Sequence, residues 1–336
     1  MKILALADLH LRENKPECRA EEEDWLKAIG DKIHFIDQTA KENKVDYIVI
    51  AGDVFDSWRN NSMPFLCHCI SWFKTLNIAA PVVCIPGNHD TMGGNLNELE
   101  RSPYELFARM KVFNDASIGD FDVYNYQFEG KQVGNHPVVI AHKGLYLKEK
   151  PYPTAPDKGN VEYFVRNCLS DSCKLLIAGD YHKPFVTKID NCTVVNCGSL
   201  MRLTAAQCDY KPAVWLCDVG DNVQVPKSDV QVPKSDVQVP KSDVQVTKSD
   251  VQVTKSDVQV PKSDVQVTKI DVPLNYPVSR EHIDSVNARQ EYLEDIIGSV
   301  EGDFEITLSF KDNFRNIVKD LDNSKEILNL FEECNK

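Results

Sequence analysis

Two stretches of the chain place an aspartate and a histidine, one residue apart, directly after an apolar run. Asp8 and His10 follow the run in LALADLH, and Asp180 and His182 follow the run in LIAGDYH. Carboxylate oxygens and imidazole nitrogens are common ligands of Mn, Fe, Mg and Zn ions. Either stretch alone is typical of a polar loop, so the rest of the sequence must decide whether both supply ligands to one metal site.

Three further apolar runs lead into side chains of the same kinds. The second run is followed by GDVFD, the third by PGNHD and the fourth by a histidine, which adds the residues Asp53, Asp56, Asn88, His89, Asp90 and His142. One ion does not need that many ligands. The five loops together therefore indicate a metal site rather than five unrelated loop ends.

The five apolar runs are predicted to be buried strands, because each is too short for a helix and is bounded by polar residues, Gly or Pro. They cover 3–7, 47–51, 82–85, 138–141 and 175–178. Helical spacing of apolar residues appears between most of them, over 21–44, 63–76, 103–110 and 161–169. Alternating strands and helices predict an α/β fold, in which binding sites form beyond the carboxyl ends of the strands.

The order and spacing of DLH, GDVFD, GNHD, His142 and GDYH resemble the calcineurin-like metallophosphoesterase superfamily over residues 1–205. GNHD differs from the GNHE of the protein Ser/Thr phosphatases in that superfamily. With NCGSLMR at 196–202, the pattern is similar to the SbcD-type DNA exonucleases of bacteria and phages. The resemblance implies a metallophosphoesterase β-sandwich flanked by helices.

The resemblance also implies roles for individual residues in hydrolysing a phosphodiester bond of DNA. Asp53 would bridge two divalent ions, and a metal-bound hydroxide would attack the phosphorus. His89 would act as general acid, with Asp90 or Asp56 orienting its ring. The remaining ligands would be Asp8, His10 and His182 for the first ion, and Asn88, His142 and Asp180 for the second.

Asp180 is a departure from the family pattern, which reads Gly-His-x-His where this chain has GDYH. A carboxylate is a harder ligand than imidazole, so we expect Mn²⁺, or alternatively Mg²⁺, rather than Zn²⁺. We expect Asp180 to bind the second ion. The alternative is a weakened second site and a catalytically weak protein that serves as a scaffold.

Charge limits how this chain could hold nucleic acid. The formal net charge of −13 excludes a protein that coats DNA through bulk positive charge. Metal ions or a few local cations would have to meet the phosphates, and Arg12, Arg59 and Lys143 lie in or beside the ligand loops. Each of these is alternatively a solvated surface charge. A small nucleotide phosphodiester is therefore the alternative substrate to DNA.

A seven-residue unit, VQV[PT]K[SI]D, repeats seven times over 223–271. Proline recurs in four copies and the valines are two residues apart, which excludes a continuous helix or a coiled coil. With one copy retained, the flanking sequence reads as a β-hairpin of the main domain. We therefore divide the chain into a nuclease domain (1–222), a flexible hairpin extension (223–271) and a C-terminal domain (272–336).

The C-terminal region is predicted to be a small α+β cap, with helices at 279–297, 313–321 and 324–333 and a strand at 304–310. It holds seven Lys and Arg against fourteen Asp and Glu, which favours a protein partner over DNA. The resemblance implies an SbcC-type coiled-coil ATPase as that partner. We expect it to dock on the apolar face formed by Ile327, Leu328, Leu330 and Phe331, and a homodimer is a further expectation. Packing within the cap is the alternative use of that apolar face.

Eleven cysteines without a CxxC pair, and no recognisable signal peptide, predict a reduced, cytoplasmic setting, in a bacterium or a phage-infected host. The N-terminal apolar run is too short to cross a membrane, so no membrane partner is expected. The sequence thus predicts a cytoplasmic DNA repair or recombination nuclease.

Overall fold

The computed structural model of the chain describes residues 1–59, 61–115, 121–131, 134–151, 153–220, 265–274, 278, 284, 314–315, 318–319 and 323–334. These divide into two compact units, Met1–Val278 and Ser279–Lys336, and each is treated by itself. The predicted strand at 304–310 and nearly all of the predicted helix at 279–297 lie outside the described residues, as do six of the seven repeat copies.

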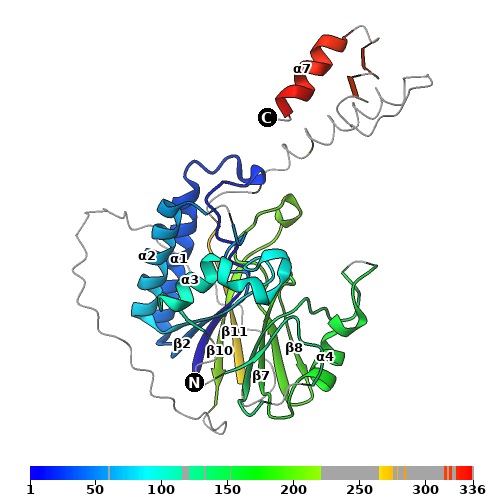
Figure 1. The fold of residues 1–336 in the computed structure, drawn as a ribbon. Coiled ribbons are helices and arrows are strands. Elements are labelled where there is room, and N and C mark those ends of the chain that lie inside the picture. Colours follow the sequence, from blue (N-terminus) through cyan, green and yellow to red (C-terminus); the bar gives the residue numbers. More distant parts are fainter. Residues whose placement is uncertain are drawn as a thin grey trace. The chain divides into compact units, whose positions relative to one another are not determined.

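The first unit contains two β-sheets (Figure 1). The six-stranded sheet has the order β11-β10-β1-β2-β3-β4, in which β1 to β4 run parallel and β10 is antiparallel to both of its neighbours. Its strands are β1 (Lys2–Leu6), β2 (Tyr47–Ala51), β3 (Val82–Ile85), β4 (Asn114–Asp115), β10 (Ala213–Val219) and β11 (Val265–Asp271).

The five-stranded sheet has the order β5-β6-β7-β9-β8 and is parallel except for β8. Its strands are β5 (Asp122–Tyr124), β6 (Val138–His142), β7 (Leu175–Gly179), β8 (Phe185–Ile189) and β9 (Cys192–Asn196). All five predicted strands are confirmed, three of them in the first sheet and two in the second.

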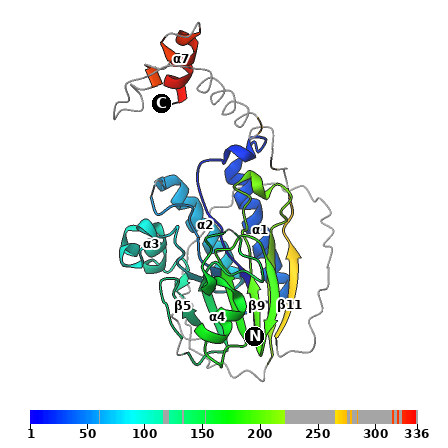
Figure 2. The same ribbon diagram turned by 90° about the vertical axis from the view of Figure 1, so that its right-hand side faces the viewer.

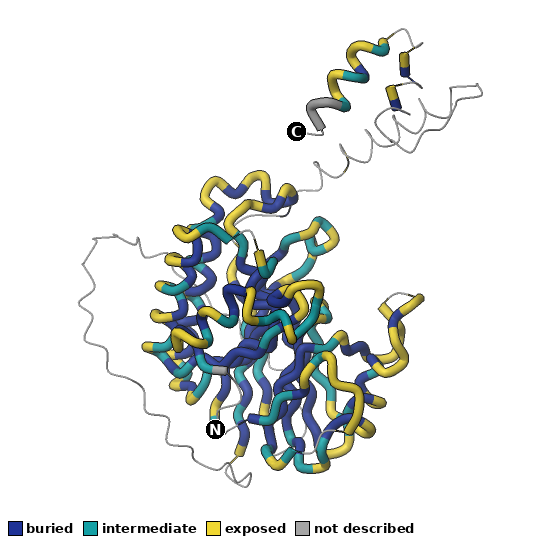
Figure 3. Tube along the Cα trace, in the orientation of Figure 1, coloured by how far each residue is buried: buried dark blue, intermediate teal, exposed yellow. Residues whose placement is uncertain are grey.

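The strands are apolar on both faces because both faces are covered. In β1, Ile3 and Ala5 join the core between the two sheets, whereas Leu4 and Leu6 join the core beneath the helices. Residues along a strand point alternately to opposite faces, so a strand buried twice needs an unbroken apolar run. Figure 3 shows the resulting buried strands at the centre of the unit.

Helices cover the two outer faces (Figures 1 and 2). The helices α1 (Trp25–Asn43), α2 (Met63–Ala79) and α3 (Pro103–Arg109) pack on the first sheet, and α4 (Val161–Cys168) packs on the second. The helices α1, α2 and α3 each begin at a capping side chain. Asp24 accepts from the N–H of Lys27, Ser62 from that of Phe65 and Ser102 from that of Glu105. The predicted α/β sandwich flanked by helices is therefore confirmed.

The last copy of the repeat is strand β11, which pairs antiparallel with β10 from Val219↔Val265 to Ala213↔Asp271. Residues 265–271 therefore belong to the folded first unit, whereas the division based on sequence placed them in the flexible extension. Val265 and Val267 are buried in the core between the sheets, and Ile270 packs on the core under the helices. The last copy alone carries isoleucine at this position, so it alone has an apolar side chain for that second core.

In the second unit, the described residues include α7 (Ser324–Cys334), close to the predicted helix at 324–333. Ile327 packs in a small core with Phe314 and Val318, Leu328 lies against it, and the rings of Phe314 and Phe331 stack at 4.3 Å. Leu330 is exposed. Three of the four residues predicted to dock a partner thus also pack within their own unit.

The described part of the chain contains no helix whose length and apolarity would let it cross a membrane.

Deleting residues 223–264 is expected to leave the first unit folded. The deletion joins Gly220-Asp221-Asn222 to Val265, which closes the β10–β11 hairpin with a three-residue loop, a common hairpin length. Shortening the loop lowers its closure entropy cost, so the free energy of unfolding should rise by about 1–2 kcal/mol. Urea unfolding followed by circular dichroism measures this change.

The matched variant is Ile270→Ser, which makes the last copy identical to the copies at 244–250 and 251–257. It should lower the free energy of unfolding by about 1–2 kcal/mol, because a half-buried isoleucine is lost from the core. A deletion protein that unfolds, or a serine variant as stable as the wild type, would contradict this assignment of β11.

Candidate metal centre

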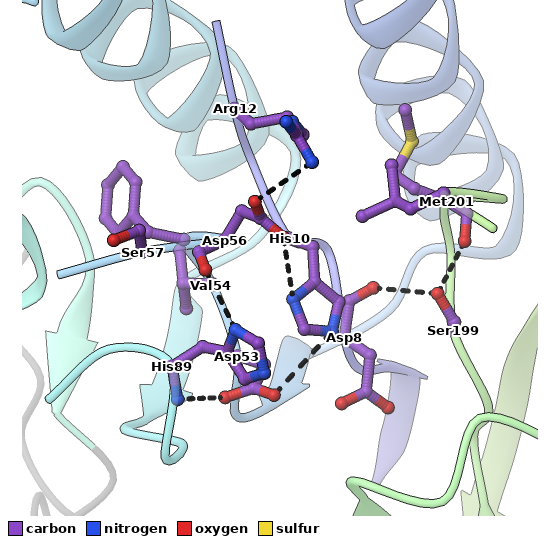
Figure 4. Close-up of polar contacts among 12 residues, drawn as sticks. Asp8, His10, Arg12, Asp53, Val54, Asp56, Ser57, His89, Ser199 and Met201 are labelled. Atoms are coloured by element: carbon purple, nitrogen blue, oxygen red, sulfur yellow. Dashed lines mark hydrogen bonds and ion pairs between the residues drawn. The ribbon is translucent and has the colours of Figure 1, made fainter. Parts of the chain in front are cut away.

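The loops that carry the predicted ligands leave the carboxyl ends of β1, β2, β3, β6 and β7, and their side chains meet at one place. Figure 4 shows the side chains that follow β1, β2 and β3. Four of their residues have left-handed backbone angles: Asp8 (φ 51°), His10 (φ 43°), Asp53 (φ 50°) and Asp180 (φ 81°). This conformation is costly outside glycine and concentrates at functional sites. The chain therefore turns sharply where each strand ends and keeps the side chains close to the sheet.

Backbone hydrogen bonds hold the first two loops side by side. The N–H of Asp8 donates to Gly52 O at 3.1 Å, that of His10 to Asp53 O at 2.9 Å and that of Leu11 to Val54 O at 2.9 Å. The spacing between Asp8 and Asp53 is thus set by the main chain.

Two glycines make room for the ligands. A Cβ on Gly87 would lie 2.1 Å from Asp53 Oδ1, and a Cβ on Gly52 would lie 2.2 Å from His142 Nδ1. Gly52 also has φ of 90°, which favours glycine. Both positions need hydrogen in place of a side chain because a ligand occupies that space.

Three sets of side chains bring their ligand atoms within 4.8 Å of one another. The sets are Asp8, His10 and His182; His10, Asp53 and His89; and Asp8, Asp53 and His142. Asp53 lies between the histidines: its Oδ2 is 3.6 Å from His10 Nε2 and its Oδ1 is 3.3 Å from His142 Nε2. A carboxylate with one oxygen toward each side is suited to be shared by two ions.

The donor set fits divalent metal ions. His10 Nε2 and His182 Nε2 face each other at 3.2 Å, and His10 Nδ1 is buried without a hydrogen-bond partner among the described residues. On the other side, His142 Nε2 lies 3.0 Å from Asn88 Oδ1, while its Nδ1–H donates to Ala51 O at 2.9 Å. A backbone acceptor on one ring nitrogen is the usual way to fix a histidine whose other nitrogen binds metal.

Electrostatics explain why cations belong here. Burial raises the pKa of Asp8 to about 8, although the His142 ring opposes the shift. Burial lowers the pKa of His10 to about 3. Burial also disfavours the charged forms of His142 and Asp53, but their mutual attraction prevails, raising the pKa of His142 to about 10 and holding that of Asp53 well below its usual range. Without metal, protons on Asp8 and His142 therefore balance the buried charge.

Of the two residues predicted to orient His89, the structure brings Asp56 to its ring, through the main chain rather than the carboxylate. Its ring is exposed, and its Nδ1–H donates to the backbone carbonyl of Asp56 at 2.8 Å. Asp90 is fully buried, and its carboxylate accepts the N–H groups of Gly87, Val54 and Phe55 at 2.8–3.1 Å. The carbonyl of Asp56 therefore orients the ring, whereas the Asp90 carboxylate joins two ligand loops.

Asp180 belongs to none of the three ligand sets formed by the described residues. Its backbone N–H donates to both carboxylate oxygens of Asp8, at 3.0 and 3.2 Å, and its side chain is exposed. The structure thus gives Asp180 a positioning contact through its main chain. Its role as a ligand of the second ion stays a prediction.

The three candidate substrate-binding cations are engaged in different ways. Arg12 Nη1 pairs with Asp56 Oδ2 at 3.2 Å beside the centre, and Lys143 Nζ donates to Tyr126 O at 3.1 Å. The Arg59 guanidinium lies 5.5 Å from the centroid of the Trp58 ring. Arg12 is the one of the three that the structure places in contact with a residue of the centre.

Residues at the end of β9 and directly after it support the centre and were not predicted as part of it. The N–H of Leu200 donates to Asp8 O at 3.2 Å. Ser199 Oγ donates to Met201 O at 2.5 Å and lies 3.4 Å from Asp8 O (Figure 4). Asn196 Nδ2 donates to Tyr181 O and Lys183 O on either side of His182. The NCGSLMR motif was the available signal, although it indicated a family rather than these contacts.

The model of the family described as calcineurin-like phosphoesterases matches residues 1–185. Among curated proteins, the uncharacterized protein R555 of Acanthamoeba polyphaga mimivirus is 28% identical over 144 residues, which is 42% of this chain and 10% of that protein. The DNA double-strand break repair protein Mre11 of Methanosarcina acetivorans is 26% identical over 197 residues, covering 54% of this chain and 31% of that protein. The chain thus spans less than a third of each of these two relatives.

A solved structure described as a novel archaeal phosphodiesterase is also similar to this chain. The similarity has a TM-score of 0.37 and 18% sequence identity, and covers 67% of this chain and 98% of the other.

Gly87→Ala is expected to weaken Mn²⁺ binding by about 100-fold or more, because the new methyl group would displace the Asp53 carboxylate. Calorimetric titration of the metal-free chain measures the affinity. The matched control is Gly93→Ala, where an added Cβ meets nothing within 4 Å; unlike Gly87, Gly93 has a positive φ, of 61°, so any cost of backbone strain falls on the control. Equal metal affinity in the two variants would contradict the position assigned to Asp53.

Metal binding should strengthen as pH rises from 6 to 8. Asp8 has a pKa raised to about 8, so below that pH the metal-free centre holds a proton that the ion must displace. Each displaced proton weakens binding about tenfold for every unit that the pH falls. The difference in Tm between Mn²⁺-loaded and EDTA-treated protein should therefore widen with pH, and a constant difference would contradict the raised pKa.

Proposed function

Because the chain belongs to the calcineurin-like phosphoesterase family, we propose that its metal centre cleaves phosphodiester bonds in DNA, as a nuclease of the SbcD type. The observation that carries the hydrolytic part is Asp53, which faces His10 with one carboxylate oxygen and His142 with the other. The DNA part is supported by the NCGSLMR motif and by the similarity to Mre11 over 54% of the chain.

The metal ions would be held in two groups that share Asp53. Asp8, His10 and His182 would hold one, and Asn88, His142 and Asp180 the other, with Mn²⁺ as the proposed ion because three of the seven ligands are carboxylates. When bound, two such ions lower the pKa of water and neutralise the phosphate charge. The family uses divalent metals; the identity of the ion is our proposal.

His89 is the proposed general acid for the leaving oxygen. The Asp56 carbonyl fixes Nδ1–H, so Nε2 is the ring nitrogen that can carry and release the transferred proton. The backbone N–H of His89 donates to Asp53 Oδ1 at 3.0 Å. This hydrogen bond fixes the proposed general acid close to the carboxylate that the two ions would share. Asp90 contributes by holding the backbone of the GNHD loop against the GDVFD loop.

A small nucleotide phosphodiester is the second candidate substrate. The observation that favours it is the lack of surplus positive charge: the chain carries −13 overall, and Arg12 is paired with Asp56. A catalytically weak scaffold is the third reading, and Asp180 in place of histidine is its support.

The proposed setting is the cytoplasm of a bacterium or a phage-infected host, in DNA repair or recombination. An SbcC-type ATPase would bind the acidic C-terminal unit, where Leu330 is exposed on α7. A homodimer is a further proposal. These assignments rest on the resemblance to SbcD-type nucleases.

The test compares two substrates in Mn²⁺: end-labelled linear duplex DNA and bis-p-nitrophenyl phosphate. Asp53→Asn should abolish cleavage of both. His89→Ala should slow DNA cleavage by about 10²–10⁴-fold. It should affect bis-p-nitrophenyl phosphate far less, because p-nitrophenolate leaves without being protonated.

His68→Ala is the matched control, since this histidine is exposed on α2 and belongs to no ligand set of the described residues. It should behave like the wild type on both substrates. If the wild type cleaves bis-p-nitrophenyl phosphate but not DNA, the small nucleotide substrate is favoured. If it cleaves neither, the scaffold is favoured. Equal losses on both substrates in His89→Ala would contradict its role as general acid.

A further inference from the structure

Three cationic side chains from separate segments are buried in one place outside the candidate metal centre. Arg19 (3% exposed) ends the 3-10 helix η1 (Glu17–Arg19), Lys32 (7%) lies on α1 and Arg202 (2%) follows the NCGSLM segment. The charges of Arg19 and Arg202, after burial itself, lower the pKa of Lys32 to about 7. The three groups are therefore close enough to repel one another.

Contacts with α1 fix this arrangement, which we call the basic cluster. The Arg19 guanidinium lies 5.4 Å from the ring centroid of Trp25, and Lys32 is seven residues further along α1, on the same face. Lys32 Nζ donates to Leu200 O at 3.1 Å, and Arg202 Nη1 donates to Cys208 O at 3.2 Å. Helix α1 and the segment after β9 thus present the cations to each other.

Around Arg19 and Lys32, the described residues supply less negative charge than positive charge. Glu22 is the one carboxylate, within the described ranges, that pairs with Arg19, at 2.5 Å from its Nη2. Glu22 is itself buried, and Lys32 has a neutral carbonyl as its acceptor. Burying a charge without compensation is costly, so this excess favours an anion as an additional component.

The Arg19 guanidinium also has donors to spare. Its Nε and Nη1 are buried and have no hydrogen-bond partner among the described residues. A buried cationic donor that lacks an acceptor destabilises the fold. The planar guanidinium can donate two parallel hydrogen bonds to an oxyanion with two acceptor oxygens. A phosphate group would supply both the acceptors and the missing negative charge.

We propose that Arg19, Lys32 and Arg202 form a binding site for a phosphate group, separate from the metal centre. The low exposure of all three side chains limits the ligand to a small oxyanion or the terminal phosphate of a nucleotide. A nucleic-acid backbone running across the surface does not meet that limit.

The site would be adjacent to the metal centre without sharing a ligand with it. Leu200 accepts a hydrogen bond from Lys32 with its carbonyl and donates to the Asp8 carbonyl with its N–H. A bound phosphate would hold Lys32 and the Leu200 segment in place. The proposal does not depend on the nature of the substrate cleaved at the metal centre.

The test measures Tm of the full chain in EDTA, so that metal-bound phosphate does not contribute. Inorganic phosphate is added at constant ionic strength against chloride. At ten times its dissociation constant it should raise Tm by about 2–5 °C. Arg19→Gln and Lys32→Met should abolish the rise, and Lys32→Met should also raise Tm without phosphate, since it removes one of three mutually repelling cations.

The matched controls are Arg109→Gln and Lys27→Met, whose side chains are 69% and 68% exposed and paired with Glu105 and Asp31. Both should keep the response of the wild type. A wild-type Tm that phosphate moves no further than chloride does would overturn the proposal, as would an undiminished rise in Arg19→Gln.

A second arm identifies the source of the phosphate, using a trinucleotide with a 5′-phosphate and the same trinucleotide with a 5′-hydroxyl. Stabilisation by inorganic phosphate and by the phosphorylated trinucleotide but not by the hydroxyl form, lost in Arg19→Gln, would support a nucleotide end as the ligand. Stabilisation by inorganic phosphate and by neither trinucleotide would support the free ion. Equal stabilisation by both trinucleotides, with none by inorganic phosphate, would overturn the site. Each outcome is independent of whether the chain cleaves DNA.

Discussion

The burial of Asp8 and Asp53 at one place is the constraint on which the rest of this structure depends. Two carboxylates removed from water must be compensated, and the chain does this with backbone N–H groups, two histidines and, when metal is bound, divalent cations. Gly52 and Gly87 are required because ligands fill the space beside them. The left-handed turns at the strand ends are the conformational cost of keeping those ligands so near the sheet.

The two-sheet architecture makes this concentration of charge possible. Asp8 and Asp53 follow closely after strands of the first sheet, and His142 and Asp180 lie at or directly after the ends of strands of the second. One apolar core lies between the two sheets, and one lies between each sheet and its helices. These three cores hold the strand ends of both sheets in fixed positions. The centre is therefore positioned by packing of the whole first unit rather than by one local motif.

Most elements that carry the site were predictable from the sequence, because a strand buried on both faces leaves an unbroken apolar run that ends at a polar loop. The division of these runs between two sheets was not, since neither face of such a run differs from the other. The role of Asp90 was also beyond prediction, because its partners are backbone N–H groups and every loop has those. The basic cluster was missed for a related reason: its three cations are far apart in sequence and look like surface charges.

Strand β11 has a consequence for how this gene can change. The copies at 244–250 and 251–257 match β11 at every position except 270. Each is a near-substitute for the edge strand, so recombination that left either of these two copies in the last position would still leave a unit able to pair with β10. A single codon, that of Ile270, distinguishes the copy that forms β11 from the copies at 244–250 and 251–257.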